Sequence, residues 1–238
     1  MFNFTVQDVI DILYRIPCVL IALILHEVAH GWVAYKLGDP TARNLGRLTL
    51  NPLKHLNPIG TLCMIFFRFG WANPVPVNMR YFKKPRRDMA IVALAGPVTN
   101  MILAVIGGLL YATFFKFFLS NDIVTYSYYI GNTAALPPAT FWISLKVALV
   151  EMSLTFMFLN ISLAVFNLIP INPLDGSRIL HLLLPAKAYY WLMQHERYIM
   201  IGLMVLLWTG IITKPLSAVV MWVANGIIDI ITLIPFFG

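Results

Sequence analysis

Long apolar stretches constrain this chain more than any other feature, because a lipid bilayer accepts few backbone structures. Segments near 9–36, 89–118, 139–168, 192–213 and 215–237 are each long enough, at roughly 20 residues, to cross the hydrocarbon region as helices. Of the 238 residues, 60% are hydrophobic and 11% are charged, whereas about a quarter are charged in soluble domains. We therefore predict an all-α polytopic membrane protein with about five transmembrane helices.

Lysine and arginine residues gather between the first two predicted spans, and this distribution predicts the orientation. The basic residues of this loop are Arg43, Arg47, Lys54, Arg68, Arg80, Lys83, Lys84, Arg86 and Arg87. Loops of this kind stay on the cytoplasmic side. Five alternating spans then place the N-terminus outside the cytoplasm and the C-terminus inside it. Because the basic residues lie between apolar stretches, the net charge of +7 fits a membrane surface and nucleic-acid binding is not expected.

The interval between the first two spans is not uniformly polar. The sequences RLTLN (47–51) and PVPVN (74–78) alternate like short strands, and IGTLCMIFF (59–67) is apolar but too short to span. We predict a small membrane-associated β-hairpin with a re-entrant piece. Since non-helical backbone at membrane depth must be buried in protein or line a wet cavity, this element also predicts a cavity.

The sequence HEVAH, residues 26–30, lies inside the first apolar stretch. Residues four apart share one face of a helix, so His26 and His30 can direct two imidazole nitrogens at one ion, while Glu27 reaches a water molecule bound to it. A carboxylate deep in a membrane helix is costly and usually functional. The pattern predicts a zinc site with Glu27 as general base. The alternative is that the three polar groups pair with one another inside the helix bundle.

A catalytic zinc ion needs a third protein ligand, and the extended HxxGxxH pattern is not present at His30. The candidate is Asp175 in NLIPINPLDGSR, residues 167–178. Two prolines there should break the third span near its cytoplasmic end and leave Asp175 in irregular backbone. His26 lies about ten residues, or roughly 15 Å of helix, before the basic boundary. Both residues therefore approach one leaflet from one side, although an ordinary Asp-Gly turn is the alternative.

Together these motifs resemble the site-2 protease family of intramembrane zinc metalloproteases. The resemblance rests on HEVAH, AGPVTN (95–100) and NLIPINPLDG (167–176), and GRLTLNPLKHLNPIGTL (46–62) and GWANPVPVN (70–78) resemble the short bacterial and archaeal branch of the family. It implies that His26, His30 and Asp175 bind zinc and that Glu27 is the general base. Neither a PDZ insertion nor a CBS domain is expected.

The resemblance also implies roles around the site. Asn167 would position substrate or stabilise the oxyanion, since an amide donates a hydrogen bond without adding charge; alternatively, it satisfies carbonyls freed by the prolines. His55 would support the metal ligands or contact substrate, or would simply cap its loop. Asn57 stands where the branch usually has aspartate. Asn160 lies on a similar face of the third span to Asn167 and could serve only to join helices.

We therefore expect a zinc metalloendopeptidase, with one Zn2+ per chain, that cleaves transmembrane segments of other membrane proteins near the cytoplasmic leaflet. An exposed strand edge at residues 74–78 could hold an unwound substrate, with a plain hairpin as the alternative. The alternative function is a membrane zinc transporter or a catalytically silent scaffold. Residues 1–238 are expected to form one integral-membrane domain, with a core at about 9–185 and a C-terminal helical hairpin at about 190–238. The substrate and oligomeric state are not predicted.

Overall fold

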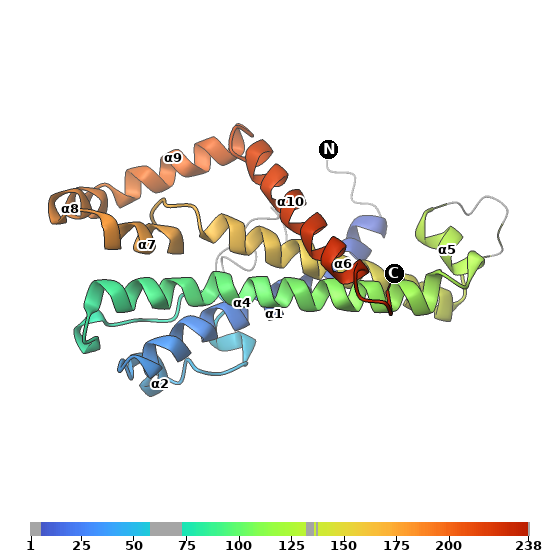
Figure 1. Cartoon of the computed structure of the whole chain (residues 1–238), viewed down its shortest axis with the longest axis horizontal. Helices are drawn as coiled ribbons and strands as arrows, with labels where there is room; N and C mark the ends of the chain where they lie inside the picture. Colours follow the sequence, from blue (N-terminus) through green and yellow to red (C-terminus); the bar gives the residue numbers. More distant parts are fainter. Residues whose placement is uncertain (1–5, 58–72, 132–135, 137, 238) are drawn as a thin grey trace.

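The computed structural model describes residues 6–57, 73–131, 136 and 138–237. Four long helices form the body of the protein (Figure 1): α1 (Val6–Lys36), α4 (Pro85–Phe114), α6 (Phe141–Asn167) and α10 (Thr213–Thr232). Within the described residues all regular secondary structure is helical, and there is no β-strand. The prediction of an all-α polytopic membrane protein is confirmed at this level.

Short elements connect the long helices. Between α1 and α4 lie α2 (Thr41–Asn44), η1 (Pro52–Lys54) and η2 (Met79–Tyr81). Between α4 and α6 lie η3, a π-helical turn (Phe115–Leu119), and α5 (Ile123–Tyr129). Between α6 and α10 lie α7 (Asp175–Leu183), α8 (Ala186–Gln194) and α9 (Glu196–Trp208).

Local chemistry fixes several helix ends. The side chain of Asp122 accepts a hydrogen bond from the Thr125 N–H and so caps the first turn of α5. Pro85 opens α4, where its missing N–H leaves no intrahelical bond unmade. Gly38 follows α1 with a φ of 109°, a conformation that ends a helix and favours glycine.

Helix α4 lies at the centre of the packing, against α6, α1 and α7, and α10 covers α6 and α4. Close approach of α4 and α6 depends on Gly107, where a Cβ atom would lie 2.9 Å from the backbone nitrogen of Met157. Met157 is fully buried and joins Ala104 and Ile227 in one apolar cluster. This arrangement holds the middle of α4 in a fixed position against its neighbours.

Within the described residues, four helices rather than the predicted five are long and apolar enough to cross a membrane: Ile12–Lys36, Pro85–Leu119, Phe141–Asn167 and Thr213–Thr232. The predicted span at 192–213 is wrong because the chain is divided there. Helix α8 ends at Gln194, α9 contains 13 residues, and Gly210 turns the chain with a φ of 78°. Thirteen helical residues reach only about 20 Å, against a hydrocarbon thickness of about 30 Å.

The predicted β-hairpin is also not supported, since neither 47–51 nor 74–78 is a strand. Two prolines in the second segment have no N–H to give to a ladder. The N–H groups of Val75 and Asn78 are instead bonded to carboxylates of α1 and of the residues just after it. The predicted re-entrant piece at 59–67 lies outside the described residues.

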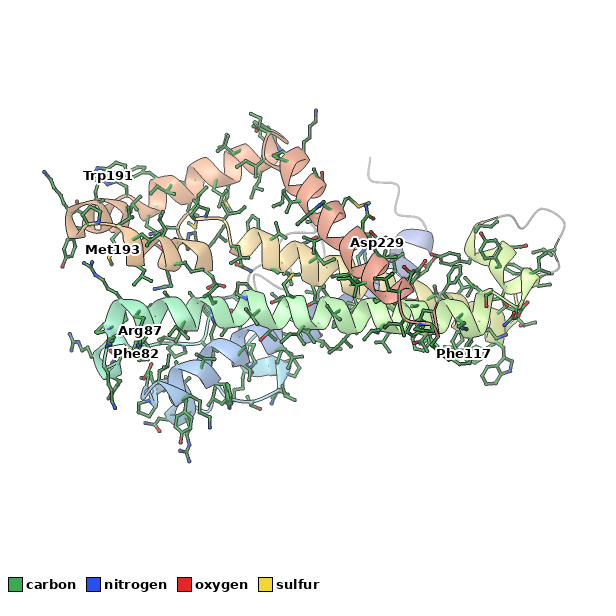
Figure 2. All side chains as sticks on the ribbon, in the orientation of Figure 1. Phe82, Arg87, Phe117, Trp191, Met193 and Asp229 are labelled. Carbon is green, nitrogen blue, oxygen red and sulfur yellow. The ribbon has the colours of Figure 1, made fainter. Side chains whose placement is uncertain are left out.

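The number of spans changes the expected position of the C-terminus, because four crossings leave both chain ends on one side and five do not. The Phe236 ring lies 6.0 Å from that of Phe117, and its carbonyl oxygen accepts a hydrogen bond from Lys116 Nζ. Figure 2 places Phe117 at the opposite end of the body from Arg87, which belongs to the basic segment. Phe236 therefore lies away from the basic segment. The cytoplasmic position predicted for the C-terminus rested on five spans, and the described residues contain four.

Candidate metal centre

Two histidines lie one turn apart on α1, as the HEVAH spacing predicts. His26 and His30 are almost completely buried, with 6% and 8% of their surfaces exposed. Their Nε2 atoms lie 3.0 Å apart, and the two rings meet edge to face. Helix geometry places both side chains on one face of α1, where their Nε2 atoms lie close together.

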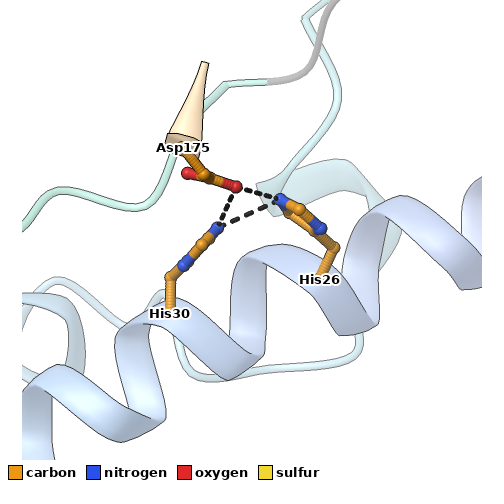
Figure 3. A group of neighbouring side chains, drawn as sticks. All are labelled: His26, His30 and Asp175. Atoms are coloured by element: carbon orange, nitrogen blue, oxygen red, sulfur yellow. Dashed lines mark hydrogen bonds and ion pairs between the residues drawn. The ribbon is translucent and has the colours of Figure 1, made fainter. Parts of the chain in front are cut away.

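Asp175 reaches the same point from a distant part of the chain. Its Oδ2 atom lies 3.2 Å from the Nε2 atom of each histidine (Figure 3). It is the first residue of α7, not part of irregular backbone as predicted, because the irregular stretch ends one residue earlier. Gly176 lets α7 begin against the end of α6, since a Cβ there would lie 2.3 Å from the Leu168 carbonyl oxygen. The structure thus brings the three predicted ligands together.

The outer nitrogen of each histidine has a partner. His30 Nδ1 lies 2.7 Å from the carbonyl oxygen of Val92 on α4. Because a carbonyl only accepts hydrogen bonds, this Nδ1 carries the proton and Nε2 keeps a lone pair. His26 Nδ1 lies 2.6 Å from Oδ1 of Asn100, also on α4, which gives the second ring the same tautomer. Both lone pairs therefore point toward Asp175.

The donor set suits a zinc ion. Nitrogen and oxygen ligands of a tetrahedral zinc ion, each about 2.0–2.1 Å from the metal, lie roughly 3.3 Å from one another; the three atoms here are 3.0–3.2 Å apart. Two lone pairs and a carboxylate oxygen this close repel one another unless a cation lies among them. Three protein ligands also leave a fourth position for water, as in catalytic zinc sites.

The surroundings of Asp175 also suit a metal ligand. Its side chain is only 17% exposed and lies against the two imidazole nitrogens that present lone pairs. Oδ2 is buried and accepts no hydrogen bond from an N–H or O–H group of the described residues. A buried anionic oxygen with no hydrogen bond is the state that metal binding would satisfy.

Gly96 explains how α4 can lie so close to the two histidines. A Cβ atom at this position would lie 2.4 Å from Cε1 of His26 and 2.5 Å from Nε2 of His30. No side chain fits there, since real Cβ atoms do not approach other atoms so closely. The glycine therefore leaves the space in which the two imidazoles converge.

Glu27 lies beside the three ligands but does not join them. Its Oε2 atom accepts a hydrogen bond of 2.8 Å from the backbone N–H of Val75. Within the described residues no hydrogen bond holds Oε1, so one carboxylate oxygen is fixed and the other is available. A half-buried carboxylate in this position can accept a proton from a nearby water molecule.

The other two predicted site residues lie outside this group. Asn167 ends α6, and its Nδ2 donates to the Leu163 carbonyl one turn earlier, at 3.0 Å. His55 is buried, and its Nε2 lies 2.8 Å from the Thr49 carbonyl oxygen, within its own loop. Among the described contacts neither residue touches a metal ligand, so their proposed roles stay predictions.

Sequence reasoning missed the contacts that orient the ligands. AGPVTN contains both Gly96 and Asn100, but the sequence alone does not connect Asn100 with His26. The contribution of Val92 is a backbone carbonyl and has no sequence signal. Val75 likewise contributes an N–H that any residue except proline would supply.

Comparison with known protein families gives one clear match. The profile of "Peptidase family M50" matches residues 14–209, which include all three metal-ligand candidates and Glu27.

Individual relatives agree with this match. The chain is 40% identical over 209 residues to a Bacillus subtilis protein named "Putative zinc metalloprotease YwhC", covering 88% of this chain and 84% of the relative. It is 31% identical over 190 residues to "Putative zinc metalloprotease Rip2" of Mycolicibacterium smegmatis, covering 73% and 61% respectively. The protein of the same name from Mycobacterium tuberculosis H37Rv is 28% identical over 209 residues, covering 85% and 70%. No solved structure matches the chain.

Proposed function

The chain belongs to peptidase family M50, the site-2 protease family, and from this premise we propose that it cleaves transmembrane segments of other membrane proteins near the cytoplasmic leaflet. It is a membrane zinc metalloprotease by its family, its relatives and its apolar helices. The cleavage position and the substrate class are the parts that we propose. The observation that carries the proposal is the convergence of two histidines and one aspartate at a buried point inside a membrane-spanning bundle.

We assign zinc binding to His26, His30 and Asp175. When bound there, zinc would polarise the scissile carbonyl and lower the pKa of a water molecule, so that the water can lose a proton and attack that carbonyl. The Val92 carbonyl and the Asn100 amide hold the two imidazoles with their Nε2 atoms inward. These contacts set the ligand geometry before substrate arrives, which is what rapid catalysis requires.

Glu27 is the proposed general base. The Val75 N–H fixes Oε2, which leaves Oε1 to accept the proton of the attacking water. The same carboxyl can then give this proton to the departing amine nitrogen, so that Glu27 ends the reaction as it began. Asn167 is proposed to position substrate, for which its amide would have to exchange the Leu163 carbonyl for the substrate. His55 is proposed to support the loop beside the site.

The proposed location in the membrane follows from the charges at the two ends of the bundle. Arg87 lies at the same end as Trp191 and the short helix α8 (Figure 2), and the positive-inside rule assigns that end to the cytoplasm. Lys36, which ends α1, lies six residues after His30, or about 9 Å of helix. The proposed site therefore lies in the cytoplasmic leaflet. With four spans, we propose that both termini lie outside the cytoplasm.

The test compares the wild type with Glu27→Gln in purified, detergent-solubilised protein. Removing the base should leave about one zinc per chain and reduce cleavage of a single-span model substrate by about 10²–10⁴-fold. Glu196→Gln is the matched control, because Glu196 is exposed at the start of α9. Cleavage at the wild-type rate by Glu27→Gln would refute the role of Glu27.

Reconstitution of the same purified protein into liposomes separates the proposal from the alternative function. A transporter would move zinc into liposomes whether or not it cleaved peptides. Zinc flux through wild-type protein that lacks proteolytic activity would favour the transporter, and zinc-dependent cleavage without flux would favour the protease.

A further inference from the structure

Three buried amide and imidazole groups join α1, α4 and α6 in one hydrogen-bonded chain. It runs from His26 Nδ1 to Asn100 Oδ1 at 2.6 Å, and from Asn100 Nδ2 to Asn160 Oδ1 at 3.0 Å. It ends where Asn160 Nδ2 donates to the carbonyl oxygen of Phe156 at 2.8 Å. Both asparagines are 0% exposed, so water does not compete for these bonds.

We infer that Asn160 is a positioning residue for zinc binding, acting on His26 through Asn100. This inference rests on the proposed function, because it takes His26 as a zinc ligand. Asn160 itself touches neither the ligand atoms nor Glu27 in the described contacts, and helix α6 supplies none of the three ligands.

The Phe156 carbonyl, at the end of this hydrogen-bonded chain, determines which group donates and which accepts in each bond. The Phe156 carbonyl can only accept a hydrogen bond, so Asn160 must present its NH2 group there and its oxygen to Asn100. Asn100 must then present its NH2 group to Asn160 and its oxygen to His26. An oxygen facing His26 Nδ1 requires a proton on that nitrogen. The lone pair of His26 is therefore left on Nε2, the atom that faces His30 and Asp175.

If the donors and acceptors of this hydrogen-bonded chain are reversed, one hydrogen bond is lost. If Nδ1 of His26 lost its proton to Nε2, Asn100 would have to rotate its NH2 group toward His26 and its oxygen toward Asn160. Asn160 would then donate to Asn100 and turn its own oxygen toward the Phe156 carbonyl. Two acceptors would face each other in a buried place, which is an unsatisfied arrangement that folded proteins avoid.

The hydrogen-bonded chain also depends on helix packing, since α1, α4 and α6 each contribute one of its side chains. If α6 moves away from α4, Asn100 is free to rotate and no longer dictates the tautomer of His26. His30 does not share this dependence, because its partner is the Val92 carbonyl of α4. The two histidine ligands are thus oriented by different means, one of which passes through α6.

The experiment measures zinc affinity by chelator competition in the full-length protein. Asn160→Leu keeps the number and branching of the side-chain heavy atoms and removes both bonds, and it should weaken zinc binding roughly tenfold, the lower end for loss of an outer partner of a metal ligand. Asn100→Leu should weaken it at least as much, and Asn160→Leu should add little in the Asn100→Leu background. Ser153→Ala is the matched control, since among the described contacts this buried hydroxyl of α6 bonds its own helix, at the Val150 carbonyl.

A second measurement uses the metal-free wild type, so it depends neither on bound zinc nor on the folding of a variant. Nitrogen chemical shifts of labelled histidine in the metal-free wild type report the tautomer, and His26 is expected to carry its proton on Nδ1. A proton on Nε2 would overturn the inference. Unchanged zinc affinity in Asn160→Leu, or an effect of equal size in the Asn100→Leu background, would also overturn it. These results leave the proposed function standing, whereas a wild type that binds no zinc would overturn both.

Discussion

The glycine at position 96 gives the sharpest test of the metal centre, because one added methyl group meets both histidine ligands. In Gly96→Ala the new Cβ would lie 2.4 Å from Cε1 of His26 and 2.5 Å from Nε2 of His30. To reach even 3.0 Å, the His26 ring must move by 0.6 Å (3.0 − 2.4) or α4 must move away by that amount. The substitution removes no ligand and no hydrogen-bonding group.

The expected size of the effect follows from the tolerance of zinc coordination. Ligand distances in a sound zinc site lie within about 0.2 Å of their ideal values, so the required shift is about three times that tolerance. Loss of an outer partner of a ligand lowers metal affinity by about 10–100-fold. Because the methyl group displaces two ligands directly, we expect the upper end, about 100-fold, which corresponds to about 2.7 kcal/mol.

The assay is zinc affinity by chelator competition, with the visible spectrum of the Co2+-substituted protein as a measure of ligand geometry. Two other Gly→Ala variants serve as controls. Gly226→Ala places its Cβ where no described atom outside the adjacent backbone of its own helix lies within 4 Å, and it should change nothing. Gly107→Ala meets the Met157 backbone at 2.9 Å, so it should lower thermal stability through α4 and α6 packing and leave zinc affinity within a few-fold of the wild type.

Two results would refute the reasoning. One is a Gly96→Ala protein that binds zinc within threefold of the wild type with an unchanged Co2+ spectrum. The other is a Gly107→Ala protein that loses zinc to the same extent, since any disturbance of α4 would then produce the effect.

Three further contacts give predictions. Asp175→Asn replaces a charged ligand by a neutral one and should reduce retained zinc well below one per chain after dialysis, measured by metal analysis; full retention would remove Asp175 from the ligand set. Val75→Pro deletes the N–H that holds Glu27, whereas Val75→Ala keeps it, so only the proline variant should cleave substrate roughly tenfold more slowly at equal zinc content; equal rates would contradict this role. Hydrogen bonds from Thr125, followed by the Lys146 charge, lower the pKa of Asp122 to about 2, from 3.8. Because the folded-state pKa is lowered, the stabilisation of α5 is present above pH 3.8 and is lost as the pH falls toward 2. The protection of α5 amides against hydrogen exchange, measured relative to the intrinsic rate at each pH, should therefore decrease over that range, and Asp122→Asn should show no such change.

The parts of the site that depend on local spacing could be predicted from the sequence. Helix periodicity alone places His26 and His30 on one face, and that geometry is found. Asp175 was reached by a longer argument, from a broken span and a shared membrane depth, and the structure does bring it to the histidines. The prediction of irregular backbone at Asp175 was wrong, since a helix begins at this residue.

The remaining features depend on information that hydropathy does not contain. Residues 198–212 are mostly apolar, but hydropathy does not report the turn at Gly210. The predicted span also included the polar residues 194–197, where α8 ends and α9 begins, so one span too many was predicted. Alternation in 74–78 suggested a strand, although two prolines remove the donors that a ladder needs. The partner of His26 depends on how α4 is rotated about its axis, which is set by packing at positions such as Gly107.

The order of the proposed ligands along the chain has a consequence for the synthesis of the protein. His30 is made 145 residues (175 − 30) before Asp175, which at about 5–20 residues per second is a delay of roughly 7–30 s. During that interval the nascent chain holds two ligands and the base but lacks the third ligand, which comes only after the third span. A protease that could damage the membrane proteins around it therefore stays incomplete until most of its own helices have been made.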